Sequence, residues 1–316
     1  MAVIDEPSGP SYGLGHADHE LERLKLQAGL IEPITRRWLL EAGIKTGMRV
    51  LDVGSGVGDV ALMAAELVGA TGEVVGTDRA TVALAIAAKR ARARSFHNVR
   101  FRKCDPSETA FDEPFDAVVG RYVLMYQADP VATVRKLVTH LRPGGLVFFH
   151  EPYRDGIRSY PTVPSYDRAR QLVDETLRGT GADPIMGIKL HATFVAAGLP
   201  IPTMRMESVI AGGAECPSHI HFEVDPLRTL LPQMERLGLA TAAELDIDTY
   251  ADRVRTELIA TGGVIVGRSE VAAWSRCPLK GMPRQVACRG GTCGDPKDTR
   301  DLVDRSDVVR YGHDNG

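Results

Sequence analysis

Short apolar runs alternate with longer amphipathic stretches along the middle of the chain. Runs rich in valine, leucine and phenylalanine predict buried strands at residues 50–53, 74–77, 115–119 and 146–149. Apolar and basic residues alternate over residues 99–102, which predicts a further strand with one partly exposed face. Aliphatic or alanine-rich stretches between them predict helices at residues 60–67, 80–93 and 131–141. Short strands separated by helices are typical of βαβ units. The pattern therefore predicts an α/β fold, a doubly wound and mostly parallel sheet with helices on both faces.

Two short helices are predicted before this alternating region. Residues 18–31 carry aliphatic side chains at three- and four-residue steps, with charged residues between them. Pro33 then interrupts the pattern, and a second helix runs to about residue 41. We expect residues 1–42 to form an N-terminal helical lid on a main domain that spans residues 43–278.

The alternation stops after the fifth predicted strand. We expect helical cap insertions near residues 154–186 and 222–262, and a final pair of strands at residues 203–210 and 264–275. Residues 279–316 are rich in charged residues and glycine, with few aliphatic side chains and no sustained period. Such a segment buries too little apolar surface to offset its ordering entropy, so we expect a disordered tail.

The composition is that of an ordinary globular protein. With 316 residues, 44% hydrophobic, 25% charged and a net charge of -3, it predicts no general attraction to nucleic acid or anionic lipid. Five cysteines make no disulfide framework and favour a reducing compartment. No apolar run approaches the roughly 18–20 residues that cross a bilayer, and the first residues do not form a secretory signal. We expect a cytoplasmic protein that acts on a small molecule, without nucleic-acid or membrane partners. The oligomeric state does not follow from the composition.

One segment joins the end of a strand, a glycine-rich turn and the start of a helix. Residues 50–59 have the sequence VLDVGSGVGD, which places Gly54, Gly56 and Gly58 directly after the first predicted strand. Glycine lets a ligand approach the backbone and tolerates positive φ, and the N–H groups that open a helix favour an anionic ligand group. A dinucleotide fingerprint needs its third glycine where this chain has Asp59, and an acid there opposes a pyrophosphate.

Acidic residues lie at the ends of the first three predicted strands. Asp78 ends the second strand, where a carboxylate can accept hydrogen bonds from both ribose hydroxyls. Asp105 follows the third strand and can accept from an exocyclic adenine amine, while Asp52 can balance an ammonium group. Three acids without a phosphate-binding lysine indicate an adenosine ligand with a cationic tail. S-adenosylmethionine matches that description.

These landmarks resemble the class I S-adenosylmethionine-dependent methyltransferases, in particular small-molecule enzymes of the ubiquinone/menaquinone C-methyltransferase type. The family's glycine motif, ribose acid and adenine acid are matched, as are its fourth-strand motif at residues 115–122 and its turn at residues 141–145. The resemblance covers about residues 48–150, and later residues match in architecture alone. It implies a cofactor site made of Asp52, Gly54, Ser55, Gly56, Gly58, Asp78, Arg79, Cys104, Asp105 and Arg121.

The resemblance implies a Rossmann-like fold and methyl transfer from S-adenosylmethionine to a small molecule by in-line SN2 displacement. The acceptor atom stays open between a hydroxyl, an amine and an activated carbon. Two other functions compete with this one. The first is a non-catalytic S-adenosylmethionine-binding module, and the second is a dinucleotide-dependent oxidoreductase, against which Asp59 argues.

His150 is the candidate catalytic residue. It ends the fifth predicted strand, and ligands of open α/β sheets bind outside the carboxyl ends of the strands. A histidine there can serve as a general base or bind substrate, and the alternative is a packed histidine whose nitrogens are bonded to backbone. No metal site is predicted, because the other histidines and the cysteines lack metal-ligand spacing. The basic run over residues 89–103 is interpreted as a solvated surface.

Overall fold

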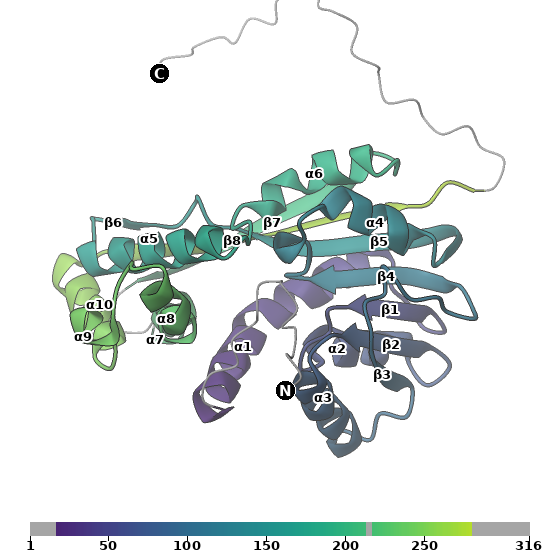
Figure 1. Cartoon of the computed structure of the whole chain (residues 1–316), viewed down its shortest axis with the longest axis horizontal. Helices are drawn as coiled ribbons and strands as arrows, with labels where there is room; N and C mark the ends of the chain where they lie inside the picture. Colours follow the sequence, from purple (N-terminus) through teal and green to yellow (C-terminus); the bar gives the residue numbers. More distant parts are fainter. Residues whose placement is uncertain (1–16, 213–216, 280–316) are drawn as a thin grey trace, which may run out of the picture. The chain divides into compact units, whose positions relative to one another are not determined.

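The computed structural model describes residues 17–212 and 217–279. In chain order its elements are α1 (Ala17–Ala42), β1 (Arg49–Val53), α2 (Asp59–Val68), β2 (Glu73–Asp78), α3 (Thr81–Ala93), β3 (Val99–Lys103), β4 (Phe115–Arg121), the 3-10 turn η1 (Leu124–Tyr126), α4 (Pro130–Val138), β5 (Leu141–Tyr153), β6 (Arg158–Tyr160), α5 (Pro164–Gly179), α6 (Met186–Ala196), β7 (Thr203–Gly212), α7 (Pro217–Val224), α8 (Pro226–Arg236), α9 (Ala242–Leu245), α10 (Tyr250–Thr261) and β8 (Val264–Arg276) (Figure 1).

The strands form one mixed sheet in the order β3-β2-β1-β4-β5-β8-β6, with β7 also paired to β8. Strands β1 to β5 run parallel to one another, and β8 runs antiparallel to β5, β6 and β7. The α/β class and the mostly parallel sheet are thus confirmed. Strand order reverses between β1 and β4, because β2 and β3 lie on one side of β1 and β4 lies on the other. The carboxyl ends at such a reversal are where open α/β sheets bind their ligands.

Helices cover both faces of the sheet (Figure 1). Trp38 of α1 packs with Phe148 of β5 in one buried cluster, and Phe194 of α6 packs with Phe149 of β5 in the other. Phe148 and Phe149 are adjacent in sequence and contribute to opposite clusters, as successive side chains of a strand do. β5 is therefore buried on both faces, which explains why its apolar run is continuous rather than alternating.

The expected break at Pro33 is wrong. α1 is a single helix of 26 residues with Pro33 inside it. Proline removes one backbone hydrogen bond from a helix interior. The side chains on either side of it, Ile31, Ile34 and Trp38, are buried against the sheet. This packing stabilises the helix across the proline, since tertiary burial outweighs local propensity.

The predicted helix over residues 131–141 is too long. α4 ends at Val138, and β5 begins at Leu141, which pairs with Phe115 in the sheet. The Pro143-Gly144-Gly145 segment therefore lies within β5 rather than before it. The strand β6 and the helix α7 were not predicted, because three and eight residues are too few to show a hydrophobic period.

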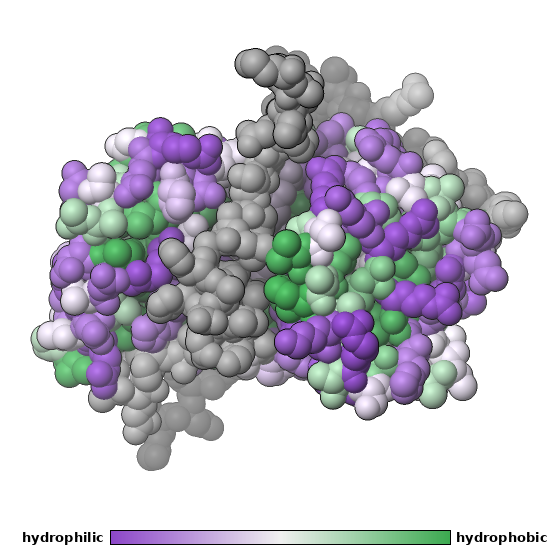
Figure 2. Space-filling view, turned by 60° about the horizontal axis from the view of Figure 1, so that its bottom comes forward, coloured by the Kyte–Doolittle hydropathy of each residue, from purple (hydrophilic) through white to green (hydrophobic). Residues whose placement is uncertain are grey.

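Helix α5 lies inside residues 154–186, and α8, α9 and α10 lie inside residues 222–262. The expected tail lies outside the described residues except for its first residue, Leu279. Hydrophobic side chains form small areas among hydrophilic ones on the face shown in Figure 2. Among the described residues, no helix combines the length and apolar character of a membrane span, and no group of three or more metal-ligand side chains is found.

Candidate cofactor-binding site

The glycine-rich turn leads from β1 into α2, and its glycines have positive φ. At Gly56, with φ of 53°, an added Cβ meets no atom within 4 Å, so this residue borders open space. At Gly58, with φ of 90°, an added Cβ would lie 3.0 Å from the Cβ of Ala87 and 3.2 Å from the ring of Phe101. Gly56 thus leaves room for a ligand, whereas Gly58 allows α2 to begin close to α3 and β3.

Asp78 connects the end of β2 to the glycine-rich turn. Its Oδ2 accepts a hydrogen bond of 2.9 Å from the N–H of Gly56, and its Oδ1 accepts one of 2.8 Å from the N–H of Ala80. Each carboxylate oxygen has a further lone pair. The carboxylate can therefore shape the turn and still accept hydrogen bonds from the hydroxyl groups of a ligand.

Two buried polar atoms beside the turn have no hydrogen-bond partner among the described residues. They are Oδ2 of Asp52 and Oγ of Ser55, and Asp52 is only 1% exposed. Burial raises the pKa of Asp52 well above its usual range, and the nearby Arg121 opposes that rise. Unpartnered buried polar groups are costly. A cationic or hydrogen-bond-donating ligand group at this place would remove that cost, so the site fits the amino-acid end of S-adenosylmethionine.

The ends of β2 and β3 bring three further predicted residues together. Arg79 forms an ion pair with Asp105, and the N–H of Cys104 donates to the carbonyl of Asp78 at 3.2 Å. Burial raises the pKa of Asp105, but hydrogen bonds from Arg79 and Ser107 outweigh it and lower the pKa overall. Asp105 is therefore a charged acceptor on the same edge of the sheet as Asp78.

Arg121 lies at the end of β4 and is almost fully buried, with 8% exposure. Its Nη1 donates to Oγ1 of Thr35 at 3.2 Å, and its Nη2 lies 3.4 Å from Oδ2 of Asp59. Asp59 also pairs with Arg90 at 2.7 Å. Two arginines thus compensate the negative charge of Asp59. The sequence pattern alone does not indicate this pairing, and there the acid at position 59 is interpreted as opposing a pyrophosphate.

His150 is fully buried, but it does not end the fifth strand as expected, because β5 continues to Tyr153. It lies opposite Arg121, the last residue of β4. Its Nε2 lies 2.8 Å from Oε2 of Glu270, and its Nδ1 lies 3.2 Å from Oγ1 of Thr35. Burial lowers the pKa of His150, although Glu270 acts in the opposite direction, so the ring is neutral near pH 7. The nitrogens are thus bonded to side chains rather than to backbone. The general-base role of His150 stays a prediction.

Glu270 and Arg268 contact the same cluster and were missed from the sequence, and the partly buried Tyr122 of the predicted fourth-strand motif joins them. The carboxylate of Glu270 accepts from Tyr122 Oη at 2.7 Å and from Arg268 Nε at 2.9 Å. Burial raises the pKa of Glu270, but Arg268 and His150 outweigh it and lower the pKa to about 2. One signal was available: two charged residues inside the otherwise apolar strand predicted at residues 264–275.

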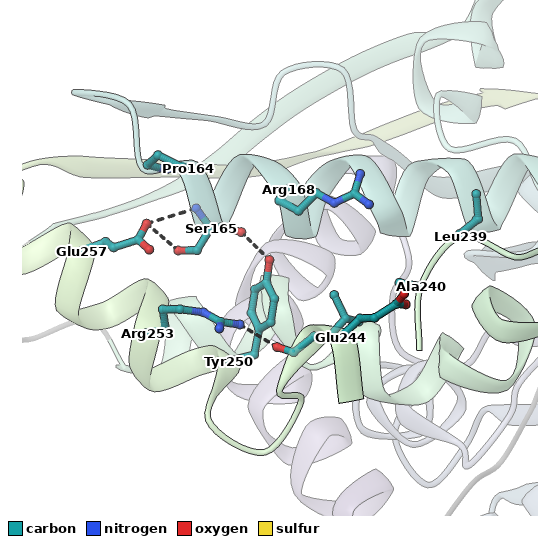
Figure 3. Close-up of a pocket in the computed structure, with 10 residues that line it drawn as sticks. Pro164, Ser165, Arg168, Leu239, Ala240, Glu244, Tyr250, Arg253 and Glu257 are labelled. Carbon is teal, nitrogen blue, oxygen red and sulfur yellow. Dashed lines mark hydrogen bonds between the residues drawn. The ribbon is translucent and has the colours of Figure 1, made fainter. Parts of the chain in front are cut away.

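A surface pocket of about 540 Å³ lies among the cap helices α5, α9 and α10, and none of the predicted site residues lines it (Figure 3). Several of its lining residues are hydrogen-bonded to one another. Glu257 accepts from the N–H and hydroxyl of Ser165, and Tyr250 Oη donates to the Ser165 carbonyl at 2.8 Å. Arg253 donates to the carbonyl of Leu245 at 2.6 Å. These bonds join the cap helices, so we interpret the pocket as their junction.

Comparison with known proteins gives a consistent result. Residues 44–178 match the family model described as a methyltransferase domain. The chain is 31% identical over 136 residues to the ubiquinone/menaquinone biosynthesis C-methyltransferase of Cellvibrio japonicus, which covers 41% of this chain and 55% of that protein. It is 35% identical over 124 residues to the 2-phytyl-1,4-naphtoquinone methyltransferase of Synechococcus elongatus, covering 38% and 53%.

The chain spans about half the length of the curated relatives it matches. Among solved structures, it resembles a candidate methyltransferase from Bacillus halodurans with a TM-score of 0.52 and 18% identity. That match covers 77% of this chain and 99% of the other. At this level of identity the likeness concerns the fold alone.

Proposed function

This chain belongs to the class I S-adenosylmethionine-dependent methyltransferases, and on that premise we propose that it transfers a methyl group from S-adenosylmethionine to a small molecule. The observation that carries the proposal is the open space at Gly56, next to the carboxylate of Asp78 and the unpartnered Oδ2 of Asp52. A turn that packed only for structural reasons would leave neither the space nor the unpartnered buried acid.

The residues around the turn divide into two groups according to what they can hold. Asp78 would accept from the ribose hydroxyls and Asp105 from the adenine amine. Asp52 and Arg121, which are buried near each other, would hold the charged amino-acid end. When bound, S-adenosylmethionine supplies an electrophilic methyl group on a sulfonium centre. The protein then has to align the methyl donor and the methyl acceptor in a site without water. The displacement is in-line, and the positive charge on the sulfur decreases in the transition state.

The acceptor class is the part of the proposal that the residues restrict least. The curated relatives named above are called quinone and naphthoquinone methyltransferases, which supports an aromatic ring carbon as acceptor. An activated carbon needs no strong base, whereas a hydroxyl or protonated amine does. His150 is the candidate for that step. It would act as a base only after releasing Thr35, whose hydroxyl lies on Nδ1.

We also propose that the protein works in the cytoplasm, without nucleic acid as substrate. A net charge of -3 supports the second point, because phosphate backbones attract strongly basic surfaces. Five cysteines without a disulfide framework support the first.

Two measurements test the proposed function. Calorimetric titration with S-adenosylmethionine, S-adenosylhomocysteine and NAD should show binding of the first two only. Incubation with S-adenosylmethionine and a panel of quinols, phenols and amines should give a product heavier by one methyl group in mass spectrometry. Cofactor binding without any product across a metabolite extract would favour a non-catalytic binding module. Binding of NAD alone would overturn the proposal.

A further inference from the structure

A continuous line of hydrogen bonds connects the candidate cofactor site to β8. Arg121 contacts Thr35 at 3.2 Å, Thr35 contacts His150 at 3.2 Å, and His150 contacts Glu270 at 2.8 Å. The four side chains come from α1, β4, β5 and β8 and are all buried. Residues 35 and 270 are far apart in sequence, so this line exists only in the folded protein.

The directions of the first and last hydrogen bonds of this line follow from counting protons. Glu270 is an ionised acceptor, so the Nε2 of a neutral His150 must carry the ring proton and donate it. Nδ1 is then an acceptor, and the Thr35 hydroxyl has one proton to share between it and the carbonyl of Ile31, which lies 3.0 Å from Oγ1 of Thr35. The oxygen of Thr35 in turn accepts from Nη1 of Arg121, which has no acceptor capacity of its own. Arg121 therefore donates to Thr35 and His150 donates to Glu270, while Thr35 shares its proton between His150 and Ile31.

Arg121 keeps donors free for a ligand in this arrangement. A guanidinium group has five N–H donors, and among the described residues Arg121 uses two of them, toward Thr35 and Asp59. Both contacts, at 3.2 and 3.4 Å, are longer than the 2.7–2.9 Å of a strong charge-assisted bond. A carboxylate brought beside Arg121 would form shorter bonds than the ones it has now. The methionine end of S-adenosylmethionine carries such a carboxylate.

We propose that Thr35 and His150 are positioning residues that aim Arg121 at the carboxylate of the bound cofactor, with Glu270 holding the ring of His150 in place. This inference rests on the proposed function, since it takes S-adenosylmethionine as the ligand. In this role both ring nitrogens of His150 are engaged, Nδ1 with Thr35 and Nε2 with Glu270. Neither ring nitrogen is therefore open to the methyl acceptor while both contacts are in place.

The test compares two ligands that differ only at the amino-acid end. S-adenosylhomocysteine carries the carboxylate and 5'-methylthioadenosine lacks it, whereas both carry the nucleoside and the thioether. In calorimetry, Thr35→Val should lower the affinity for S-adenosylhomocysteine by about 10-fold or more, because it removes the hydrogen bond to the charged Arg121. The affinity for 5'-methylthioadenosine should stay within about 2-fold of wild type. Thr35→Ser keeps the hydroxyl and should restore the loss.

Arg121→Gln is the reference for the contact itself and should show the same selective loss. If Arg121→Gln loses S-adenosylhomocysteine selectively and Thr35→Val does not, the positioning role is overturned while the contact by Arg121 stands. If Thr35→Val weakens both ligands equally, Thr35 supports the whole site rather than Arg121, and the inference fails. A folded wild-type protein that binds neither ligand would refute the proposed function instead. Circular dichroism of each variant shows that it is folded before it is titrated.

Discussion

The backbone N–H of Gly56 donates to Oδ2 of Asp78 at 2.9 Å. This bond ties the turn after β1 to the end of β2, the two strands whose carboxyl ends form the proposed nucleoside site. The acid that would bind the ribose thus also shapes the loop that would lie under the methionine group. Removing its side chain should therefore affect both parts of the ligand.

We expect Asp78→Ala to weaken S-adenosylhomocysteine binding by about 2–4 kcal/mol, or about 30- to 1,000-fold. The reason is the loss of charge-assisted hydrogen bonds to the ribose hydroxyls. Isothermal titration calorimetry measures the change. Asp78→Asn loses the negative charge but keeps one acceptor oxygen for a ribose hydroxyl, so its affinity should fall less.

Because Asp78 also accepts from Gly56 and Ala80, the unliganded Asp78→Ala protein should melt lower than wild type. We expect a shift of about 2–4 °C for each kcal/mol lost, as in domains of this size. Wild-type affinity in a folded Asp78→Ala protein would contradict the assignment of the ribose site.

Gly56→Val should abolish cofactor binding and leave the sheet folded. A valine is strained at φ of 53°, and its side chain would fill the open space beside the turn. The matched control is Gly58→Val, whose Cβ would clash with Ala87. Gly58→Val should therefore have a lower melting temperature as well as a lower affinity for the cofactor. Unchanged binding in a folded Gly56→Val protein, followed by calorimetry, would mean that the space at Gly56 is not the ligand site.

Glu151→Ala should destabilise the protein strongly. The Oε1 of Glu151 accepts from the N–H groups of Val123 and Leu124 at 2.9 and 2.8 Å, and its Oε2 accepts from Met125 at 3.3 Å. Removing the carboxyl leaves these buried donors unpaired, at about 1–3 kcal/mol for each well-formed bond. Urea unfolding should show a loss of roughly 3–5 kcal/mol for Ala and much less for Glu151→Gln. Equal losses in the two variants would show that shape rather than hydrogen bonding matters there.

The same carboxyl predicts a pH dependence of stability. Burial raises the pKa of Glu151 from 4.5 to about 8, and the three N–H groups only partly oppose it. The folded protein then holds a proton that the unfolded chain has released, so stability is fully present below pH 4.5 and falls as the pH rises toward about 8. Urea unfolding at pH 6.5 and 8.5 should give a drop of about 1–2 kcal/mol for wild type. Glu151→Gln does not titrate and should lack this part of the drop, and an equal drop in both proteins would assign it to other groups.

Local sequence patterns predicted those features of the fold and site whose cause is local. The apolar runs and helical periods of residues 48–150 depend on neighbouring residues, and the order of βαβ units follows from them. The glycine turn was recognisable for the same reason, since strand, turn and helix start are contiguous in the chain. The continuous helix through Pro33 was not, because it depends on burial of Ile31 and Trp38 against strands that come later.

By itself, then, the sequence determined an α/β fold, the position of a glycine-rich turn and the acids that follow the strands around it. Only the tertiary structure decided how the charges are paired. Thr35 gave no signal as a site residue because it lies in an amphipathic helix, and the charge of Glu270 within a late strand did not show which residue it would contact. Folding brings both to His150, and burial there leaves each hydrogen bond no alternative partner in water. Whether a buried histidine is a base or a support therefore depends on neighbours more than a hundred residues away.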